Sequence, residues 1–149
     1  ELFMRVVIQR VSRAKVIVGK QTFSEIEDGL LVFVGVFRED FVEYADWLAK
    51  KTLNLRIFSD RNNRMNRSIL DCRYGLLVVS QFTLAADCDR GNRPSFALAA
   101  DPEKAGIIYE NYVQALTTSG LTVRTGDFGS DMEVEMVNDG PATFVLDRV

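Results

Sequence analysis

Short apolar segments of strand length recur along most of this chain, whereas only two segments carry the spacing of a helix. The strand-like segments, rich in β-branched residues, are Met4–Val11, Lys15–Val18, Gln21–Ile26, Leu30–Val36, Leu55–Phe58, Gly75–Phe82, Leu121–Thr125, Met132–Val137 and Ala142–Leu146. Strands and helices do not alternate regularly, so repeated βαβ units are not indicated. We therefore predict an α+β fold: a single domain with a mostly antiparallel or barrel-like sheet and two main helices packed outside it.

Both predicted helices have a recognisable start and an apolar face. Asp40 can cap the first helix, and Asp101-Pro102-Glu103 combines a capping side chain, a first-position proline and an acid. Apolar residues recur about every 3.6 positions; they are Phe41, Tyr44, Ala45, Leu48, Thr52 and Leu55, and then Ala105, Ile108, Tyr109, Tyr112, Val113 and Leu116. Each helix is therefore expected to pack against the sheet.

The length of 149 residues fits one domain, which we place at residues 4–149. Glu1–Phe3 precedes Met4 and is interpreted as a cloning remnant or an alternative start. The longest apolar run, Leu30–Phe37, is too short to cross a bilayer, which takes about 20 apolar residues. No signal peptide is indicated and the two cysteines are expected to be reduced thiols, so we expect a cytoplasmic protein with no membrane partner.

The chain contains no histidine, which removes several catalytic designs. Histidine-based triads, imidazole acid–base catalysis and histidine-ligated zinc are excluded. The sequence has no phosphate-binding loop, dinucleotide fingerprint or paired-cysteine zinc motif, so neither a cofactor nor a metal is expected. Asp127-Phe128-Gly129 matches a kinase tripeptide, but the chain is too short for a kinase and lacks the other kinase motifs. The net charge of −3 argues against a broad footprint on duplex DNA.

Two polar segments interrupt the apolar pattern. Ser80-Gln81-Phe82-Thr83-Leu84 places two hydroxyls and an amide at the end of a buried strand, where backbone hydrogen bonding alone could also explain them. Asn138-Asp139-Gly140-Pro141-Ala142-Thr143 lies between two predicted strands and also has the composition of a β-turn. Glycine lets the backbone approach a ligand or another chain closely, and the sequence does not determine whether the Gly-Pro bond is cis.

A third segment, Arg90-Gly91-Asn92-Arg93-Pro94-Ser95-Phe96, lies between these two. Arginine beside an exposed phenylalanine is a mixture that holds phosphate and stacks bases in single-stranded RNA. A solvated basic loop has the same composition, so the segment indicates RNA binding only in combination with the others.

Taken together, these segments resemble the D-aminoacyl-tRNA deacylases, also called D-tyrosyl-tRNA deacylases, over nearly the whole chain from Met4. The resemblance is carried by Met4–Val11, Gly29–Val32, Gly35-Val36, Arg56–Phe58, Ser80–Ala86, Gly91–Phe96 and Val137–Pro141. The Ser-Gln-Phe-Thr form is similar to that of the D-specific branch, whereas the related animal-type deacylases vary both signature motifs.

This resemblance implies a homodimer that hydrolyses the ester between a D-amino acid and the 3′-terminal adenosine of tRNA, as proofreading in translation quality control. It implies that Ser80, Gln81, Phe82 and Thr83 form the catalytic strand end. Without a side chain to exclude, glycine would also pass, so glycyl-tRNA is a further expected substrate.

The resemblance also implies how the substrate is held. The Gly140-Pro141 bond is expected to be cis and to reach across the dimer into the partner's active site. Its carbonyls would bind the α-amino group and leave no room for an L-side chain. Asn138, Arg10 and Phe96 are the other expected substrate-binding residues, with Arg10 placed near the dimer-spanning loop.

Two mechanisms remain open for ester hydrolysis without histidine. In one, Thr83 attacks and forms an acyl-enzyme, but a threonine needs an activating base and none is evident near it in the sequence. In the other, water attacks, backbone N–H groups near Gln81 to Thr83 hold the oxyanion, and the ribose 2′-hydroxyl assists. We favour the second mechanism.

Two other classes of function also remain. A non-catalytic, RNA-binding dimeric module is indicated by the basic residues Arg61, Arg64, Arg67, Arg90 and Arg93, and would bind RNA without turnover. A structural dimer that uses Trp47 or Tyr109 at its interface would have no pocket beside Ser80 and Gly140.

Overall fold

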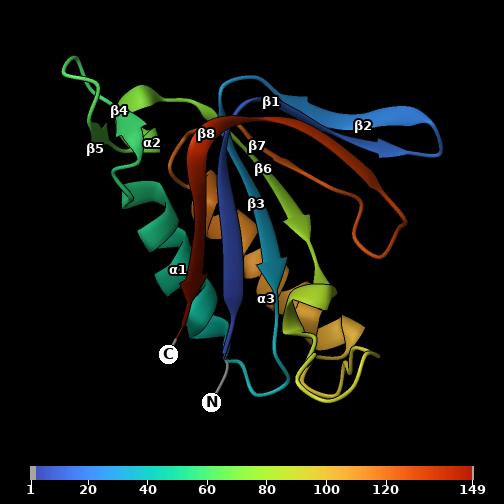
Figure 1. Ribbon diagram of the computed structural model, residues 1–149. Coiled ribbons are helices and arrows are strands. Elements are labelled where there is room, and N and C mark those ends of the chain that lie inside the picture. Colours follow the sequence, from blue (N-terminus) through green and yellow to red (C-terminus); the bar gives the residue numbers. More distant parts are fainter. Residues whose placement is uncertain (1–2, 149) are drawn as a thin grey trace.

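The computed structural model describes residues 3–148 and contains one main sheet with its two long helices on one face (Figure 1). The elements are β1 (Arg5–Val18), β2 (Gln21–Ile26), β3 (Gly29–Gly35), α1 (Val42–Asn54), β4 (Phe58–Ser59), β5 (Met65–Arg67), α2 (Ile69–Cys72), β6 (Gly75–Ser80), the 3-10 helix η1 (Phe82–Ala85), α3 (Pro102–Thr117), β7 (Val123–Thr125) and β8 (Glu133–Asp147). The predicted α+β fold, with a largely antiparallel, barrel-like sheet and two main helices outside it, is confirmed.

The sheet order is β2-β1-β3-β6-β7, and β8 pairs with β1. β1 is antiparallel to β2, β3 and β8, whereas β3–β6 and β6–β7 are parallel pairs. The first half of β1 pairs with β3 and the second half with β2, while β8 follows β1 along both halves. Register shifts between Gln9 and Arg13 mark the place where this ribbon curls over the sheet (Figure 1).

Both ends of the chain form longer strands than predicted. Met4–Val11 and Lys15–Val18 belong to the single strand β1, and the two last predicted strands belong to the single strand β8. The polar segment Asn138–Thr143 is therefore a bend within β8 and not the β-turn between two strands. The reason is that β1 pairs with β8 on both sides of the bend, so the hydrogen bonding between the two strands resumes after it.

The main core lies between the sheet and the helices α1 and α3. Tyr112 is fully buried there, and its hydroxyl shares a hydrogen bond of 2.8 Å with Thr52 of α1. Burial raises the pKa of Tyr112, so the phenol stays protonated and neutral inside the core. The hydroxyl of Tyr109 donates to the carbonyl of Val78 at 2.8 Å. These bonds tie α3 both to α1 and to the strand that ends at Ser80.

Two glycines let β3 and β6 begin side by side. Gly29 pairs with Gly75, and a Cβ atom added to Gly29 would lie 1.8 Å from the Gly75 carbonyl oxygen. No side chain fits in that space, so the close approach requires glycine.

The predicted cap of the first helix is wrong. Helix α1 begins after Phe41 without a side-chain cap. Asp40 is instead buried, and its carboxylate accepts the backbone N–H groups of Met4 at 2.8 Å and Phe37 at 2.7 Å. It therefore joins the start of β1 to the loop after β3. The cap predicted for the second helix is confirmed, because Asp101 accepts the Lys104 N–H at 2.9 Å and Pro102 follows it.

Of the segment Glu1–Phe3, which we interpreted as a cloning remnant or an alternative start, residues 1 and 2 lie outside the described residues. Residue 149, the last of the predicted domain, also lies outside them. Phe3 is described, and its ring packs edge-on against Tyr44 with 5.4 Å between centroids. No helix within residues 3–148 is long and apolar enough to span a membrane.

Candidate functional site

The end of β6 places a polar strand end beside a pocket. Residues 76–79 are fully buried, whereas Ser80 and Gln81 are half-buried where the chain leaves the sheet. The N–H of Gln81 donates to the carbonyl of Val34 at 2.8 Å, which extends the pairing with β3 by one residue. The chain then turns into η1, which presents Phe82 and Thr83 to solvent.

The pocket has a volume of about 630 Å³ and a mixed apolar and polar lining. Its lining residues are Val79, Ser80, Gln81, Phe82, Phe96, Ala99, Ala100, Pro102, Ala105, Phe128, Gly129, Ser130, Asp131, Met132 and Val134. The rings of Phe82 and Phe96 meet edge-to-face with 5.1 Å between centroids, and both remain about half exposed. Exposed aromatic rings beside polar groups suit a ligand with a flat ring and a polar end.

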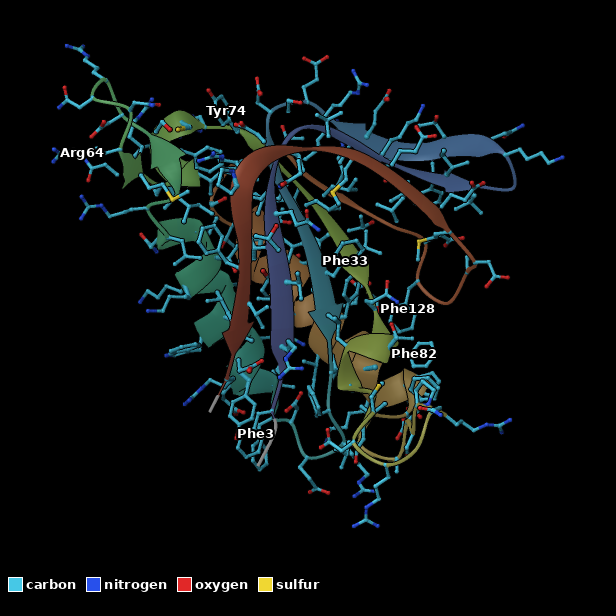
Figure 2. All side chains as sticks on the ribbon, viewed as in Figure 1. Phe3, Phe33, Arg64, Tyr74, Phe82 and Phe128 are labelled. Carbon is cyan, nitrogen blue, oxygen red and sulfur yellow. The ribbon has the colours of Figure 1, made fainter. Side chains whose placement is uncertain are left out.

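The opposite wall of the pocket is the loop between β7 and β8, which the sequence analysis did not assign to the site. Its Phe128 packs against Tyr109 with 5.7 Å between ring centroids, and it lies near Phe82 in Figure 2. Ser130 donates a hydrogen bond of 2.5 Å to Asp127 and so fixes the loop. A phenylalanine between glycines in a loop could have indicated that Phe128 belongs to the site. The sequence analysis considered Asp127-Phe128-Gly129 only as a possible kinase motif.

Among the described residues, the Thr83 hydroxyl has one hydrogen-bond partner. The amide of Gln81 donates to the Thr83 hydroxyl at 2.6 Å. Within residues 3–148, no carboxylate or amine is hydrogen-bonded to that hydroxyl. A nucleophilic hydroxyl requires an acceptor for its proton, and the Gln81 amide is a donor in this arrangement.

The second predicted segment forms an exposed bend held from beneath by Arg10. The Gly140-Pro141 peptide bond is cis, as the family resemblance implied. Arg10 is only 8% exposed, and its Nε donates to the carbonyl of Asp139 at 2.9 Å. Its Nη1 donates to the carbonyl of Ile57 at 2.6 Å, so one buried guanidinium supports both the bend and the start of β4.

Asn138 braces the same bend from the side. Its amide donates to the carbonyls of Arg10 at 3.0 Å and Ala142 at 3.2 Å. A Cβ atom on Gly140 would lie 2.7 Å from the Asn138 side-chain oxygen, so the brace leaves room only for glycine. Gly140 and Pro141 themselves face solvent.

The structure does not bring the two segments together within one chain. Arg10, beneath the bend, is level with Leu30 of β3 and therefore with Leu76 of β6. Ser80 lies four residues farther along β6, roughly 13 Å away along the strand, and on the far side of β3. The predicted residues thus form a pocket group (Ser80, Gln81, Phe82 and Phe96) and a bend group (Arg10, Asn138, Gly140 and Pro141). Thr83 does not line the pocket itself and reaches it only through its hydrogen bond with Gln81.

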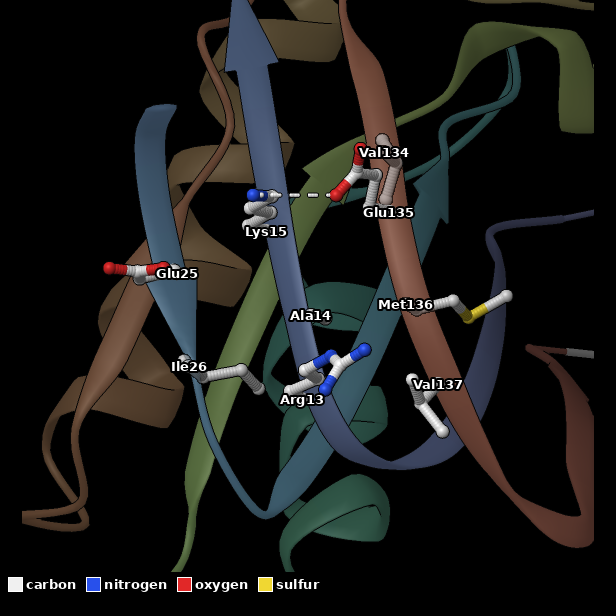
Figure 3. Close-up of a pocket in the computed structure, with 9 residues that line it drawn as sticks. All are labelled: Arg13, Ala14, Lys15, Glu25, Ile26, Val134, Glu135, Met136 and Val137. Carbon is white, nitrogen blue, oxygen red and sulfur yellow. Dashed lines mark ion pairs between the residues drawn. The ribbon is translucent and has the colours of Figure 1, made fainter. Parts of the chain in front are cut away.

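A second cavity of about 620 Å³ is lined by residues of β1, β2 and β8 (Figure 3). It is lined by Arg13, Ala14, Lys15, Glu25, Ile26, Val134, Glu135, Met136 and Val137. Lys15 and Glu135 pair across it at 3.4 Å. The cavity contains no hydroxyl or amide side chain and none of the predicted site residues, so the pocket at Ser80 is the better candidate for chemistry.

The chain matches known proteins along nearly its whole length. Residues 7–147 match the family model described as D-Tyr-tRNA(Tyr) deacylase. D-aminoacyl-tRNA deacylases from Thermotoga petrophila and Thermosipho africanus are 54% and 51% identical over 144 residues, covering 97% of this chain and 97% of each relative. A solved structure of the c-Myc DNA unwinding element binding protein has a TM-score of 0.91 and 37% identity, covering 97% of this chain and 99% of that one.

A second solved structure supports the fold. A probable eukaryotic D-amino acid tRNA deacylase has a TM-score of 0.87 over 97% of this chain and 99% of its own, at 16% sequence identity.

Proposed function

The chain belongs to the D-Tyr-tRNA(Tyr) deacylase family, and we propose that it hydrolyses the ester that links a D-amino acid to the 3′-terminal adenosine of tRNA. The products are the free D-amino acid and tRNA, and the reaction takes place in the cytoplasm. The observation that carries the proposal is the pocket beside Ser80 and Gln81, which joins aromatic walls to a polar strand end. Phe82 and Phe96 stack against the terminal adenine, because a flat base suits two exposed rings.

The hydrolytic step uses water and not Thr83. The water oxygen bonds to the ester carbonyl carbon, the bond from that carbon to the ribose 3′-oxygen breaks, and a proton passes to the 3′-oxygen. The N–H of Gln81 already donates to Val34, so the N–H groups of Phe82 and Thr83, which begin η1, stabilise the oxyanion. The neighbouring ribose 2′-hydroxyl supplies the acid–base function that the side chains lack.

A second copy of the chain completes the site. The exposed, braced bend at Gly140-Pro141 lies away from its own pocket, which supports insertion into the pocket of a partner in a homodimer. Its carbonyls accept hydrogen bonds from the substrate α-amino group, and an L-side chain would collide with the bend. Arg10 and Asn138 hold those carbonyls in place. Selection by collision with backbone tolerates many D-side chains and admits glycine, so glycyl-tRNA is also a substrate.

The test is deacylation of D-Tyr-tRNA, L-Tyr-tRNA and glycyl-tRNA by the purified chain, with the dimer measured by light scattering. Turnover of the D-ester and the glycyl ester, with the L-ester spared, is the expected result. Equal turnover of the D- and L-esters would overturn the chiral assignment. Binding of tRNA without turnover of any ester would instead favour the RNA-binding module.

A further inference from the structure

The hairpin formed by β4 and β5 concentrates positive charge on a chain that is acidic overall. Residues 56–67, here named the arginine hairpin, contain four arginines (56, 61, 64 and 67) and one acid, Asp60, giving +4 − 1 = +3 on a chain of net charge −3. Residues 61–67 are all exposed. Figure 2 shows Arg64 at the far end of the molecule from Phe82, so the arginine hairpin lies away from the pocket of its own chain.

The arginine hairpin forms no close ion pair with an acid among residues 3–148. The four ion pairs among residues 3–148 involve Arg5, Arg10, Lys15 and Arg38, and none involves the arginine hairpin.

The one acid within the arginine hairpin, Asp60, stabilises the turn between β4 and β5. The Asp60 carboxylate accepts the backbone N–H groups of Asn62 at 2.8 Å and Arg64 at 3.1 Å. Arg56 and Arg67 donate to backbone carbonyls, at 2.9 and 3.2 Å. The carboxyl of Asp71 lies near both: hydrogen bonds with Ser68 and, to a smaller extent, the charges of Arg67 and Arg56 lower its pKa. The arginines of the hairpin with no such acid beside them among residues 3–148 are therefore Arg61 and Arg64.

Hydrogen bonds from Arg10 connect the arginine hairpin to the bend at Gly140. The buried Arg10 donates to Ile57 just before β4 and to Asp139 within the bend, at 2.6 and 2.9 Å. Between the two elements lies a small cavity of about 170 Å³, whose lining includes Arg10, Arg67 and Asp139. Wherever the bend is placed, the arginine hairpin is therefore carried beside it.

Resting on the proposed cross-subunit position of the bend, we propose that the arginine hairpin of one subunit binds the sugar-phosphate backbone of the tRNA whose 3′ end occupies the partner's pocket. The bend enters that pocket, so the arginine hairpin of the same chain lies outside its mouth, where the acceptor stem must leave. Guanidinium groups suit phosphate because their fork of N–H donors matches its oxygens. The exposed amides of Asn62, Asn63 and Asn66 add donors for phosphate and ribose oxygens.

The first experiment compares two substrates that differ only in their RNA. The double variant Arg61→Gln/Arg64→Gln is assayed with D-Tyr-tRNA and with 3′-O-D-tyrosyl-adenosine, which has no phosphate. We expect kcat/KM for the tRNA to fall about tenfold or more, as two charged hydrogen bonds would allow, with the adenosine ester unaffected. The slope of log kcat/KM against log salt should become shallower by about 0.9 for each phosphate contact removed.

A matched variant controls for net charge. Lys50→Gln/Arg124→Gln removes the same charge from exposed positions on α1 and β7, and both substrates should be cleaved as by the unaltered chain. The inference would be overturned if the control lowered kcat/KM for D-Tyr-tRNA as much as Arg61→Gln/Arg64→Gln does. It would also be overturned if Arg61→Gln/Arg64→Gln lowered kcat/KM equally for D-Tyr-tRNA and for the adenosine ester. If the unaltered chain cleaves neither ester, the proposed function fails first, and a direct tRNA-binding assay of the same variants then decides whether the arginine hairpin binds RNA.

The second experiment tests whether the contact is made across the dimer. Heterodimers purified through two tags pair a chain whose pocket is filled by Ala100→Trp with a chain whose pocket is open. Arg61→Gln/Arg64→Gln should lower tRNA turnover when placed on the filled chain, whose bend and arginine hairpin serve the open pocket. On the open chain it should have no effect. The reverse pattern would show that the arginine hairpin acts within its own subunit and would overturn the cross-subunit contact.

Discussion

The Gln81 side-chain amide donates a hydrogen bond of 2.6 Å to the Thr83 hydroxyl at the edge of the pocket. The hydroxyl therefore accepts from a neutral donor, and no base among residues 3–148 is hydrogen-bonded to it to take its proton. We expect Thr83→Val to lower the single-turnover rate on D-Tyr-tRNA by no more than about fivefold, the equivalent of one hydrogen bond of about 1 kcal/mol. Thr83→Ser, which keeps the hydroxyl, is the control. A loss of more than about a thousandfold with Thr83→Val alone would identify a nucleophile.

The ribose 2′-hydroxyl should be indispensable if the side chains supply no acid or base. A D-Tyr-tRNA that ends in 2′-deoxyadenosine should be cleaved about a hundredfold more slowly or worse, because positioned acid–base groups contribute at least that much. Single-turnover rates measured beside the matching ribose substrate isolate this effect. The proposed water mechanism fails if the two esters are cleaved at the same rate while both bind equally well.

The brace between Asn138 and Gly140 should act as one unit. Gly140→Ala pushes a Cβ atom to within 2.7 Å of the Asn138 oxygen and displaces an amide that makes two hydrogen bonds. Asn138→Ala removes the same bonds directly. Each change should destabilise the protein by about 1–3 kcal/mol in urea denaturation and lower D-Tyr-tRNA turnover. Because the residues share one interaction, the double variant should be little worse than either single variant, and strict additivity would contradict the brace.

Asp40 should make stability depend on pH in the direction opposite to most acids. Burial raises its pKa, more than the hydrogen bonds from Phe37 and Met4 lower it. The folded state thus binds this proton more tightly than the unfolded state does. The free energy of unfolding of the native chain, minus that of Asp40→Asn, should therefore decrease as pH rises. The decrease should start near the ordinary Asp pKa of about 3.9 and end at the raised folded pKa.

The measurement is urea denaturation of both chains between about pH 4 and 7, where the other carboxyl groups cancel in the difference. A difference that grows with pH would contradict the raised pKa. Asn can accept only one of the two backbone N–H groups held by Asp40, so the native chain should remain the more stable at neutral pH.

Elements with strong local signals were predictable from the sequence. The buried strands β3 and β6 are continuous apolar runs, and α3 starts at the predicted Asp101-Pro102 cap. The polar strand end at Ser80 was identified as a site candidate because polar groups there broke an apolar pattern, and it does border the pocket. In each case the deciding information lies within a few neighbouring residues.

The remaining features depend on partners distant in sequence. Asn138–Thr143 has the composition of a turn, and only the pairing of β8 with β1, more than 120 residues away, makes it a bend inside a strand. Asp40 looked like a helix cap, yet its carboxylate is captured by Met4, 36 residues away. Phe128 became a pocket wall because β7 pairs in parallel with β6 and brings the next loop to Ser80.

The bend at Gly140 consists of extra residues inserted in β8 within its pairing with β1. Asn138 pairs with Val11 and Thr143 with Gln9, so β8 takes 143 − 138 = 5 steps where β1 takes 11 − 9 = 2. The three extra residues have no place in the sheet and are pushed outward as a unit. The number of these residues therefore limits how far the bend can project, and the side chains of Arg10 and Asn138 hold it in place. Removing one of the three would leave two extra residues between the same paired positions, so the projection would shorten while β8 keeps its register with β1 on either side.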